Sequence, residues 1–144
     1  MITKYARGAA ALAVAGWLVA SAPAFADSIT YVADLSAASV VPPTDSKATG
    51  MVTATYDAAT KELVWKGTYA GLSGAETAAH FHIGAAGKNG GVAVPMAAAA
   101  SPFEGKATLS DAQAADLAAG NWYVNIHTGA HPDGEIRGQV VVGK

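Results

Sequence analysis

Short runs that alternate apolar and polar residues dominate the chain from about residue 28 onward, and clusters of turn-forming residues separate them. An alternation with a period of two is typical of β-strands that turn one face toward a core. Several of these runs are also rich in β-branched and aromatic residues, which pack well on a pleated sheet. We therefore predict strands in the runs 29–32, 50–56, 62–69, 78–83, 92–94, 105–109, 122–126 and 136–142.

One segment departs from this alternation. Ser110 is followed by the alanine-rich stretch 111–119 and then by Gly120. Serine is a favoured helix N-cap, and glycine tolerates the left-handed conformation that ends many helices. A single short helix at about 110–119 is therefore predicted. Together the segments predict an all-β fold, namely an immunoglobulin-like or Greek-key antiparallel β-sandwich with one short helix.

The N-terminal segment has a different character from the rest of the chain. Two basic residues precede the apolar run 8–20, and the small-x-small sequence 24–26 follows it. This pattern is typical of a cleaved secretory signal, and the apolar run is shorter than the ~20 residues that span a bilayer. We expect a signal peptide over 1–26 and one mature domain over 27–144, in the periplasm or secreted, with no membrane span after cleavage. An uncleaved N-terminal anchor is the alternative.

Composition narrows the chemistry that the chain can perform. Nine Lys and Arg residues stand against eleven Asp and Glu residues, which argues against a nucleic-acid-binding protein. The chain has no cysteine, so disulfides, thiolate nucleophiles, iron–sulfur clusters and thiolate zinc sites are excluded. Any metal must therefore be held by histidine, carboxylate or backbone ligands.

A histidine pair stands out in the run 78–83. His80 and His82 are two residues apart, so a strand directs both imidazoles to the same side, with Cα atoms roughly 6 to 7 Å apart. Two imidazoles on one side of a strand can chelate one ion, and copper or zinc is the metal that suits them. A third ligand must then come from another strand.

The remaining two histidines lie in one other short segment. His127 is the natural candidate for the third ligand, and His131 on the following turn is a candidate fourth ligand. Asp133 or Glu135 could accept a hydrogen bond from a ligand ring and orient it. The alternative is that these histidines only form hydrogen bonds within a half-polar sheet and bind no metal.

The C-terminal hairpin is predicted to have one polar face. Alternation places Tyr123, Asn125 and His127 on the same side of their strand, and Glu135 and Arg137 share one side of the next run. These residues could surround a site and support its ligands. They could equally form a solvated sheet face in which cross-strand polar pairs are structural.

These segments resemble the two signature blocks of the CHRD domain, the module named after chordin. The first block comprises 79–84 and 87–92, the second comprises 123–128 and 132–140, and residues 41–50 and 109–120 are similar to other parts of the family. The resemblance implies an immunoglobulin-like or related β-sandwich. It also implies an exported protein of the bacterial secreted single-domain type, without carrying over the growth-factor binding of chordin.

The His-x-His pair is also similar to that of copper/zinc superoxide dismutases, which are Greek-key β-proteins. This chain lacks the cysteine pair of that family and has too few histidines for its two metal sites. Dismutase activity is therefore not expected from this similarity. A single mononuclear site on a related frame is compatible with it.

Three functions are consistent with the sequence. The first is an exported, non-catalytic binding or structural module whose partner is a protein or a polysaccharide. The second is a mononuclear copper- or zinc-binding protein that uses His80, His82 and His127. The third is an enzyme, either a dismutase-like oxidoreductase or a hydrolase with a metal-bound water. The enzyme is the least favoured because the sequence contains no Gly-x-Ser-x-Gly elbow, Walker loop or His-Glu-x-x-His motif.

Overall fold

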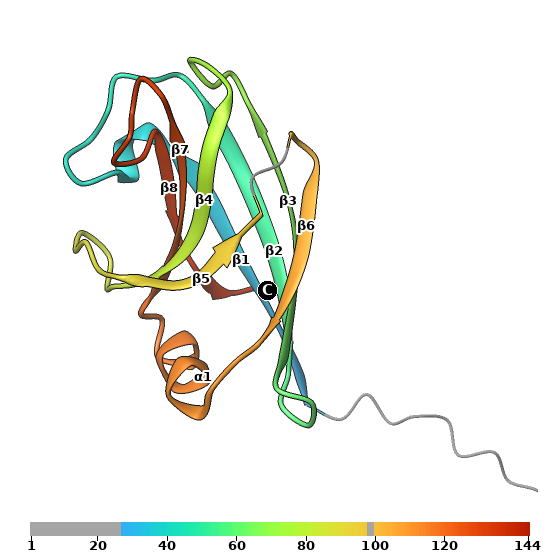
Figure 1. Ribbon diagram of the computed structural model, residues 1–144. Helices are drawn as coiled ribbons and strands as arrows, with labels where there is room; N and C mark the ends of the chain where they lie inside the picture. The colour runs from blue at the N-terminus through green and yellow to red at the C-terminus, as the bar shows by residue number, and fades with distance from the viewer. Residues whose placement is uncertain (1–26, 98–99) are drawn as a thin grey trace, which may run out of the picture.

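The computed structural model describes residues 27–97 and 100–144, and these form one antiparallel sheet with a short helix (Figure 1). The predicted signal peptide lies outside the described residues. The strands are β1 (Ser28–Ser36), β2 (Thr49–Asp57), β3 (Glu62–Ala70), β4 (Glu76–Ile83), β5 (Val92–Met96), β6 (Phe103–Thr108), β7 (Trp122–Thr128), β8 (Ile136–Gln139) and β9 (Val141–Val142). Each of the eight predicted runs overlaps at least one of these strands. No helix among the described residues is long and apolar enough to cross a membrane.

The strands are hydrogen-bonded in the order β5-β4-β7-β8-β1-β2-β3-β6, and β9 pairs with β1 off this path. The sheet curls into a nearly closed barrel whose two edges are β5 and β6 (Figure 1). The sequence correctly predicted an all-β antiparallel fold with one short helix. The expected division into two separate sheets, as in an immunoglobulin-like sandwich, is not found.

The reason for this difference lies where the two halves of the sheet meet. Strands β1 and β8 pair antiparallel at a single position, Ser36 opposite Arg137. That one position connects the half β5-β4-β7-β8 to the half β1-β2-β3-β6, so the hydrogen-bonded path is continuous. The two halves still pack against each other, because Trp65 on β3 meets Phe81 on β4 edge to face with ring centroids 5.3 Å apart. A single pairing position of this kind has no signature in the alternation of the sequence.

The helix α1 (Asp111–Ala118) lies where the sequence predicted it. The Ser110 hydroxyl accepts a hydrogen bond from the Gln113 backbone N–H, and the Gln113 side chain accepts one from the Ser110 N–H. This reciprocal capping box satisfies two of the backbone donors that a helix start leaves free. Gly120 then takes a positive φ of 76° beyond the helix end. Local chemistry therefore accounts for both ends of the helix.

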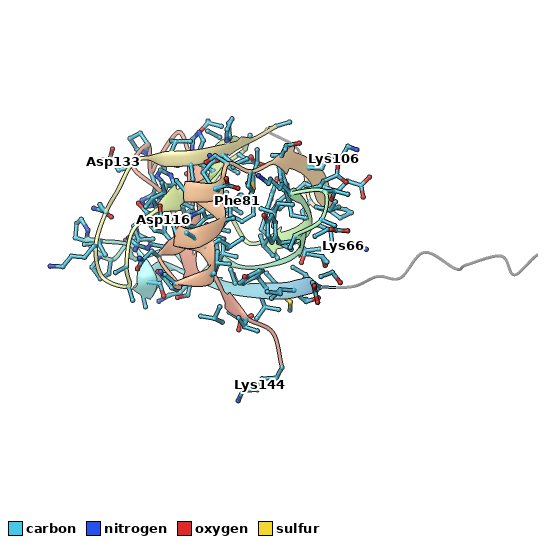
Figure 2. The ribbon with its side chains drawn as sticks, turned by 90° about the horizontal axis from the view of Figure 1, so that it is seen from below. Lys66, Phe81, Lys106, Asp116, Asp133 and Lys144 are labelled. Atoms are coloured by element: carbon cyan, nitrogen blue, oxygen red, sulfur yellow. The ribbon has the colours of Figure 1, made fainter. Side chains whose placement is uncertain are left out.

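The core fills the inside of the curled sheet. Its largest fully buried apolar side chains are Trp122, Phe81, Leu63, Leu117, Ile126 and Ile136. Figure 2, seen from below, shows Phe81 in the interior and Lys66, Lys106 and Lys144 at the periphery. Strand β7 is buried along both of its faces, since the side chains that point away from this core are also covered. In Figure 1 the loops 37–48, 84–91 and 129–135 all lie on the side of β7 and β8.

Candidate metal centre

Three histidines from two adjacent strands converge outside the core. Strand β4 pairs antiparallel with β7, with His80 opposite Asn125 and His82 opposite Tyr123. Residues directly opposite each other share a face, and His127 lies two residues beyond Asn125, so all three imidazoles lie on the same side of the sheet. The His80 Nδ1 atom lies 3.2 Å from His127 Nε2. One ligand nitrogen from each of the three rings falls within a group of atoms at most 4.8 Å apart.

Backbone carbonyls orient two of the three rings. His82 Nδ1 donates to the Gly90 carbonyl oxygen at 3.0 Å, and His127 Nδ1 donates to the Pro132 carbonyl oxygen at 2.9 Å. A carbonyl oxygen can only accept, so in both rings the proton is on Nδ1 and Nε2 keeps its lone pair. His82 is only 9% exposed, and its buried Nε2 has no hydrogen-bond partner. The arrangement therefore contains a buried, unsatisfied nitrogen lone pair.

The surroundings of His80 and His82 favour the neutral form of both rings. Burial lowers the pKa of His80, and the neighbouring His127 lowers it further. Burial is also the main cause that lowers the pKa of His82; the hydrogen bond to Gly90 opposes it, and His80, His127 and Arg137 add smaller lowering contributions. A neutral imidazole is the form that coordinates a metal. Both rings are thus in the ligand form at neutral pH.

A stack of three side chains supports His82 from behind. The rings of His82 and Tyr123 are parallel within 5°, with centroids 4.8 Å apart. The guanidinium carbon of Arg137 lies 3.5 Å from the centroid of the Tyr123 ring. Strands β4 and β8 flank β7, so the imidazole and the guanidinium cover opposite faces of the tyrosine. Such stacking holds the His82 ring at a fixed orientation.

Arg137 also holds the loop that orients His82. Its Nη2 donates to the carbonyls of Lys88 at 2.7 Å and Ala85 at 3.3 Å, and its Nη1 donates to Asn89 Oδ1 at 3.0 Å. The Tyr123 hydroxyl accepts a hydrogen bond from the Gly90 N–H at 3.1 Å. Gly90 needs to be glycine because a Cβ atom would overlap the Ile83 carbonyl oxygen.

Glu135 lies in a separate polar cluster. Its carboxylate accepts hydrogen bonds from the hydroxyls of Ser46 at 2.6 Å, Thr128 at 2.6 Å and Ser73 at 2.8 Å, and from the Ser73 N–H at 2.9 Å. Burial alone would raise its pKa, but these four hydrogen bonds outweigh burial and hold the pKa at about 2. Contrary to the sequence-based expectation, Glu135 orients no histidine ring. Its side chain instead joins the loop residues Ser46 and Ser73 to Thr128 at the end of β7.

A comparison with protein-family models gives a match over residues 31–140, to the CHRD domain. The chain belongs to the CHRD domain family. None of the curated proteins and none of the solved structures compared with it gives a match. The three histidines, the Tyr123–Arg137 stack and Glu135 all lie within the CHRD domain.

The histidine cluster of this CHRD domain comprises His80, His82 and His127 and does not include His131, the predicted fourth ligand. The chain reverses between Thr128 and His131, whose backbones exchange hydrogen bonds of 3.3 and 3.1 Å. His131 instead lines an open cavity of about 460 Å³ between the segments 40–45 and 130–134. Spacing along a strand could not indicate the direction of a residue beyond the strand end.

The ring of His127 is oriented by Pro132, and Asn125 supports the turn that carries it. The Asn125 side-chain amide donates to the Asp133 carbonyl oxygen at 3.1 Å, so Asp133 contributes its backbone and not the predicted carboxylate. Gly134 has a φ of 122°, and a Cβ atom there would overlap the Asn125 amide. Sequence reasoning missed the roles of the Pro132 and Gly90 carbonyls, because every residue carries a carbonyl and side-chain types do not mark it.

Proposed function

We propose that this CHRD domain binds one copper or zinc ion through His80, His82 and His127. The observation that carries the proposal is the buried Nε2 atom of His82, which has no partner although it belongs to a cluster of three imidazoles. Leaving a buried acceptor unsatisfied costs roughly 1 to 3 kcal/mol. A metal ion would use this lone pair.

The distances support such an ion. Imidazole bonds to zinc or copper are about 2.0 to 2.1 Å long, so two nitrogens 3.2 Å apart can bind one ion at an angle of about 100°. A tetrahedral angle with these bonds needs nitrogens about 3.4 Å apart, so the largest separation, 4.8 Å, must shorten by about 1.4 Å on binding. Small torsions of His80 and His127, which are only half-buried, provide this adjustment.

The donor set selects the class of metal. Neutral imidazoles suit copper and zinc, whereas calcium and magnesium need oxygen ligands. The cluster contains no carboxylate, and among divalent ions the order of affinities places Cu²⁺ above Zn²⁺. Three protein ligands leave a coordination position for water or another external donor. Storage, delivery and metal-dependent catalysis are all compatible with such a position.

The proposal includes export to the periplasm or beyond, on the pattern of the N-terminal segment. A non-catalytic module that binds a protein or a polysaccharide is the alternative function. The open cavity beside His131, walled by prolines and flanked by Asp45 and Asp133, supports that alternative. A measurement of metal binding distinguishes the two functions, because only the first requires a bound ion.

The test is a calorimetric titration of the purified, metal-free protein with Cu²⁺ and with Zn²⁺ near pH 7. We expect one ion per chain with sub-micromolar affinity, and loss of that binding in a His80→Ala/His82→Ala variant. His131→Ala is the matched control, because it removes a histidine from the turn after the strand of His127 that lies outside the cluster. Equal weakening in the control, or no stoichiometric binding by the parent protein, would reject the metal site.

A further inference from the structure

Arg137 is a buried cation without a counter-ion in the described part of the chain. Its side chain is 2% exposed, and its hydrogen-bond acceptors are two backbone carbonyls and the Asn89 amide oxygen, all of them neutral. Burial lowers the pKa of Arg137, but a guanidinium stays protonated in proteins. An unpaired buried charge of this kind is uncommon, because taking it out of water costs several kcal/mol.

This charge lies close to the histidine cluster. The Tyr123 ring separates Arg137 from His82, and the two stacking distances place the guanidinium carbon within about 8 Å of the centre of the His82 ring. Tyr123 is 2% exposed, so the space between the cation and the ligand is filled by an aromatic ring and not by water. Electrostatic interactions across such a region are screened much less than at the surface.

Among the described residues, no carboxylate accepts a hydrogen bond from Arg137, and none belongs to the histidine cluster. The Glu135 carboxylate is held by Ser46, Ser73 and Thr128 and faces neither Arg137 nor the histidines. A metal ion at this site therefore experiences the positive charge of Arg137 directly, and an ion of charge two is repelled more than an ion of charge one.

We propose that Arg137 determines the oxidation-state preference of this centre, shifting bound copper toward Cu(I) and away from Cu(II) and Zn²⁺. The inference rests on the proposed function, since it needs copper at His80, His82 and His127. The reaction is Cu(II) plus one electron giving Cu(I), with the electron taken from an external one-electron donor such as ascorbate. Arg137 forms no bond to the metal, so it is a positioning residue that acts through its charge and through Tyr123.

The experiment measures the affinities of the full protein for Cu(I) and for Cu(II), each by competition with a chromophoric chelator. Arg137→Met removes the charge at similar length, and we expect the ratio of Cu(I) to Cu(II) affinity to fall roughly tenfold. For a one-electron couple, tenfold corresponds to a fall in midpoint potential of about 59 mV. Arg137→Lys keeps the charge, so its ratio should stay within about twofold of the parent value.

Two further variants separate charge from structure. Lys88→Met removes an exposed charge from the same loop and should leave the ratio unchanged, because solvent screens it. Asn89→Asp places a carboxylate at the atom that accepts from Arg137 Nη1, so it offsets the charge while keeping the arginine. It should lower the ratio in the same direction as Arg137→Met, and it serves as the test if Arg137→Met does not fold.

The outcomes are distinct. If the parent protein binds neither copper ion, the proposed function fails and the inference fails with it. If copper binds with an unchanged ratio in Arg137→Met and Asn89→Asp, the inference alone is overturned. An equal fall in Arg137→Lys and Arg137→Met also overturns it, because hydrogen bonding and not charge would then be responsible.

Discussion

Two polar clusters, the histidines of β4 and β7 and the group around Glu135, differ in how completely their buried atoms are satisfied. The Glu135 carboxylate accepts four hydrogen bonds, and its pKa of about 2 follows from them. The histidine cluster instead leaves the buried His82 Nε2 without a partner. A polar cluster that only supports the fold uses its hydrogen-bonding capacity within the chain. The unused lone pair of His82, beside two further imidazoles, is therefore what distinguishes the histidine cluster and supports the proposed metal site.

The largest effect that separates the two clusters is on metal binding. His80→Ala should weaken copper and zinc binding at least about 100-fold, because it removes one of three ligands. The same change should lower the unfolding free energy of the metal-free protein by about 1 kcal/mol or less, since His80 is half-buried. Calorimetric titration and chemical denaturation measure the two quantities. A large loss of stability in the metal-free variant would place the histidines among the structural residues.

Glu135→Gln should give the opposite result. Loss of the charged acceptor should lower the unfolding free energy by about 2 to 3 kcal/mol, because charged hydrogen bonds between three segments are weakened. Metal affinity should change less than about twofold, since Glu135 does not contact the histidines. Urea denaturation of the metal-free variant, paired with the metal titration, gives both numbers. Weakened metal binding in a fully folded Glu135→Gln variant would show that Glu135 supports the histidine cluster, and would contradict independent roles for the two clusters.

The stabilisation by Glu135 should depend on pH in a defined direction. Its pKa in the folded protein is about 2, below the ordinary value of 4.5, so the folded state binds fewer protons than the unfolded state between these values. The contribution is fully present above about pH 5 and is lost as the pH falls through the folded pKa. The stability difference between the parent and Glu135→Gln should therefore be constant from pH 5 to 7 and narrow toward pH 2. A constant difference across that whole range would exclude the carboxylate as its source.

A smaller change tests how much one hydrogen bond to Glu135 contributes to the unfolding free energy. Ser46→Ala removes one of the four hydrogen bonds and should lower the unfolding free energy by about 1 kcal/mol. Its thermal unfolding should lie between those of the parent and Glu135→Gln. A matched Ser39→Ala change, at an exposed serine outside this cluster, should have an effect within about 0.5 kcal/mol. Equal losses in the two serine variants would mean that the Ser46 hydroxyl adds nothing specific.

The parts of the fold that depend on local pattern could be predicted from the sequence. Alternation indicated the strands, and Ser110 with Gly120 marked the ends of the one α-helix in the described residues. Alternation also placed His80 and His82 on one side of their strand and His127 on the same side of its own strand as Asn125 and Tyr123. The resemblance to CHRD domains came from the same segments and is confirmed over residues 31–140.

The parts that depend on long-range contacts could not be predicted. Glu135 meets Ser46 and Ser73 across 89 and 62 residues of chain, and no periodicity relates these positions. For the same reason the structure assigns Glu135 to a different cluster from the histidines and leaves His131 outside the histidine group. The loops that bury the polar face of β7 likewise follow from tertiary packing, so a face that alternation would leave in solvent is covered.

The sequence by itself determined the elements, the family and the set of residue types that can bind a metal. Strand periodicity and helix capping depend on residues only a few positions apart, and the lack of cysteine is a matter of composition. All three can therefore be recognised from the sequence alone. Only the tertiary structure decided which strands are neighbours, which carbonyls hold the His82 and His127 rings, and which cation lies behind Tyr123. These features arise from contacts between distant segments, and their geometry exists only once the sheet has closed around its core.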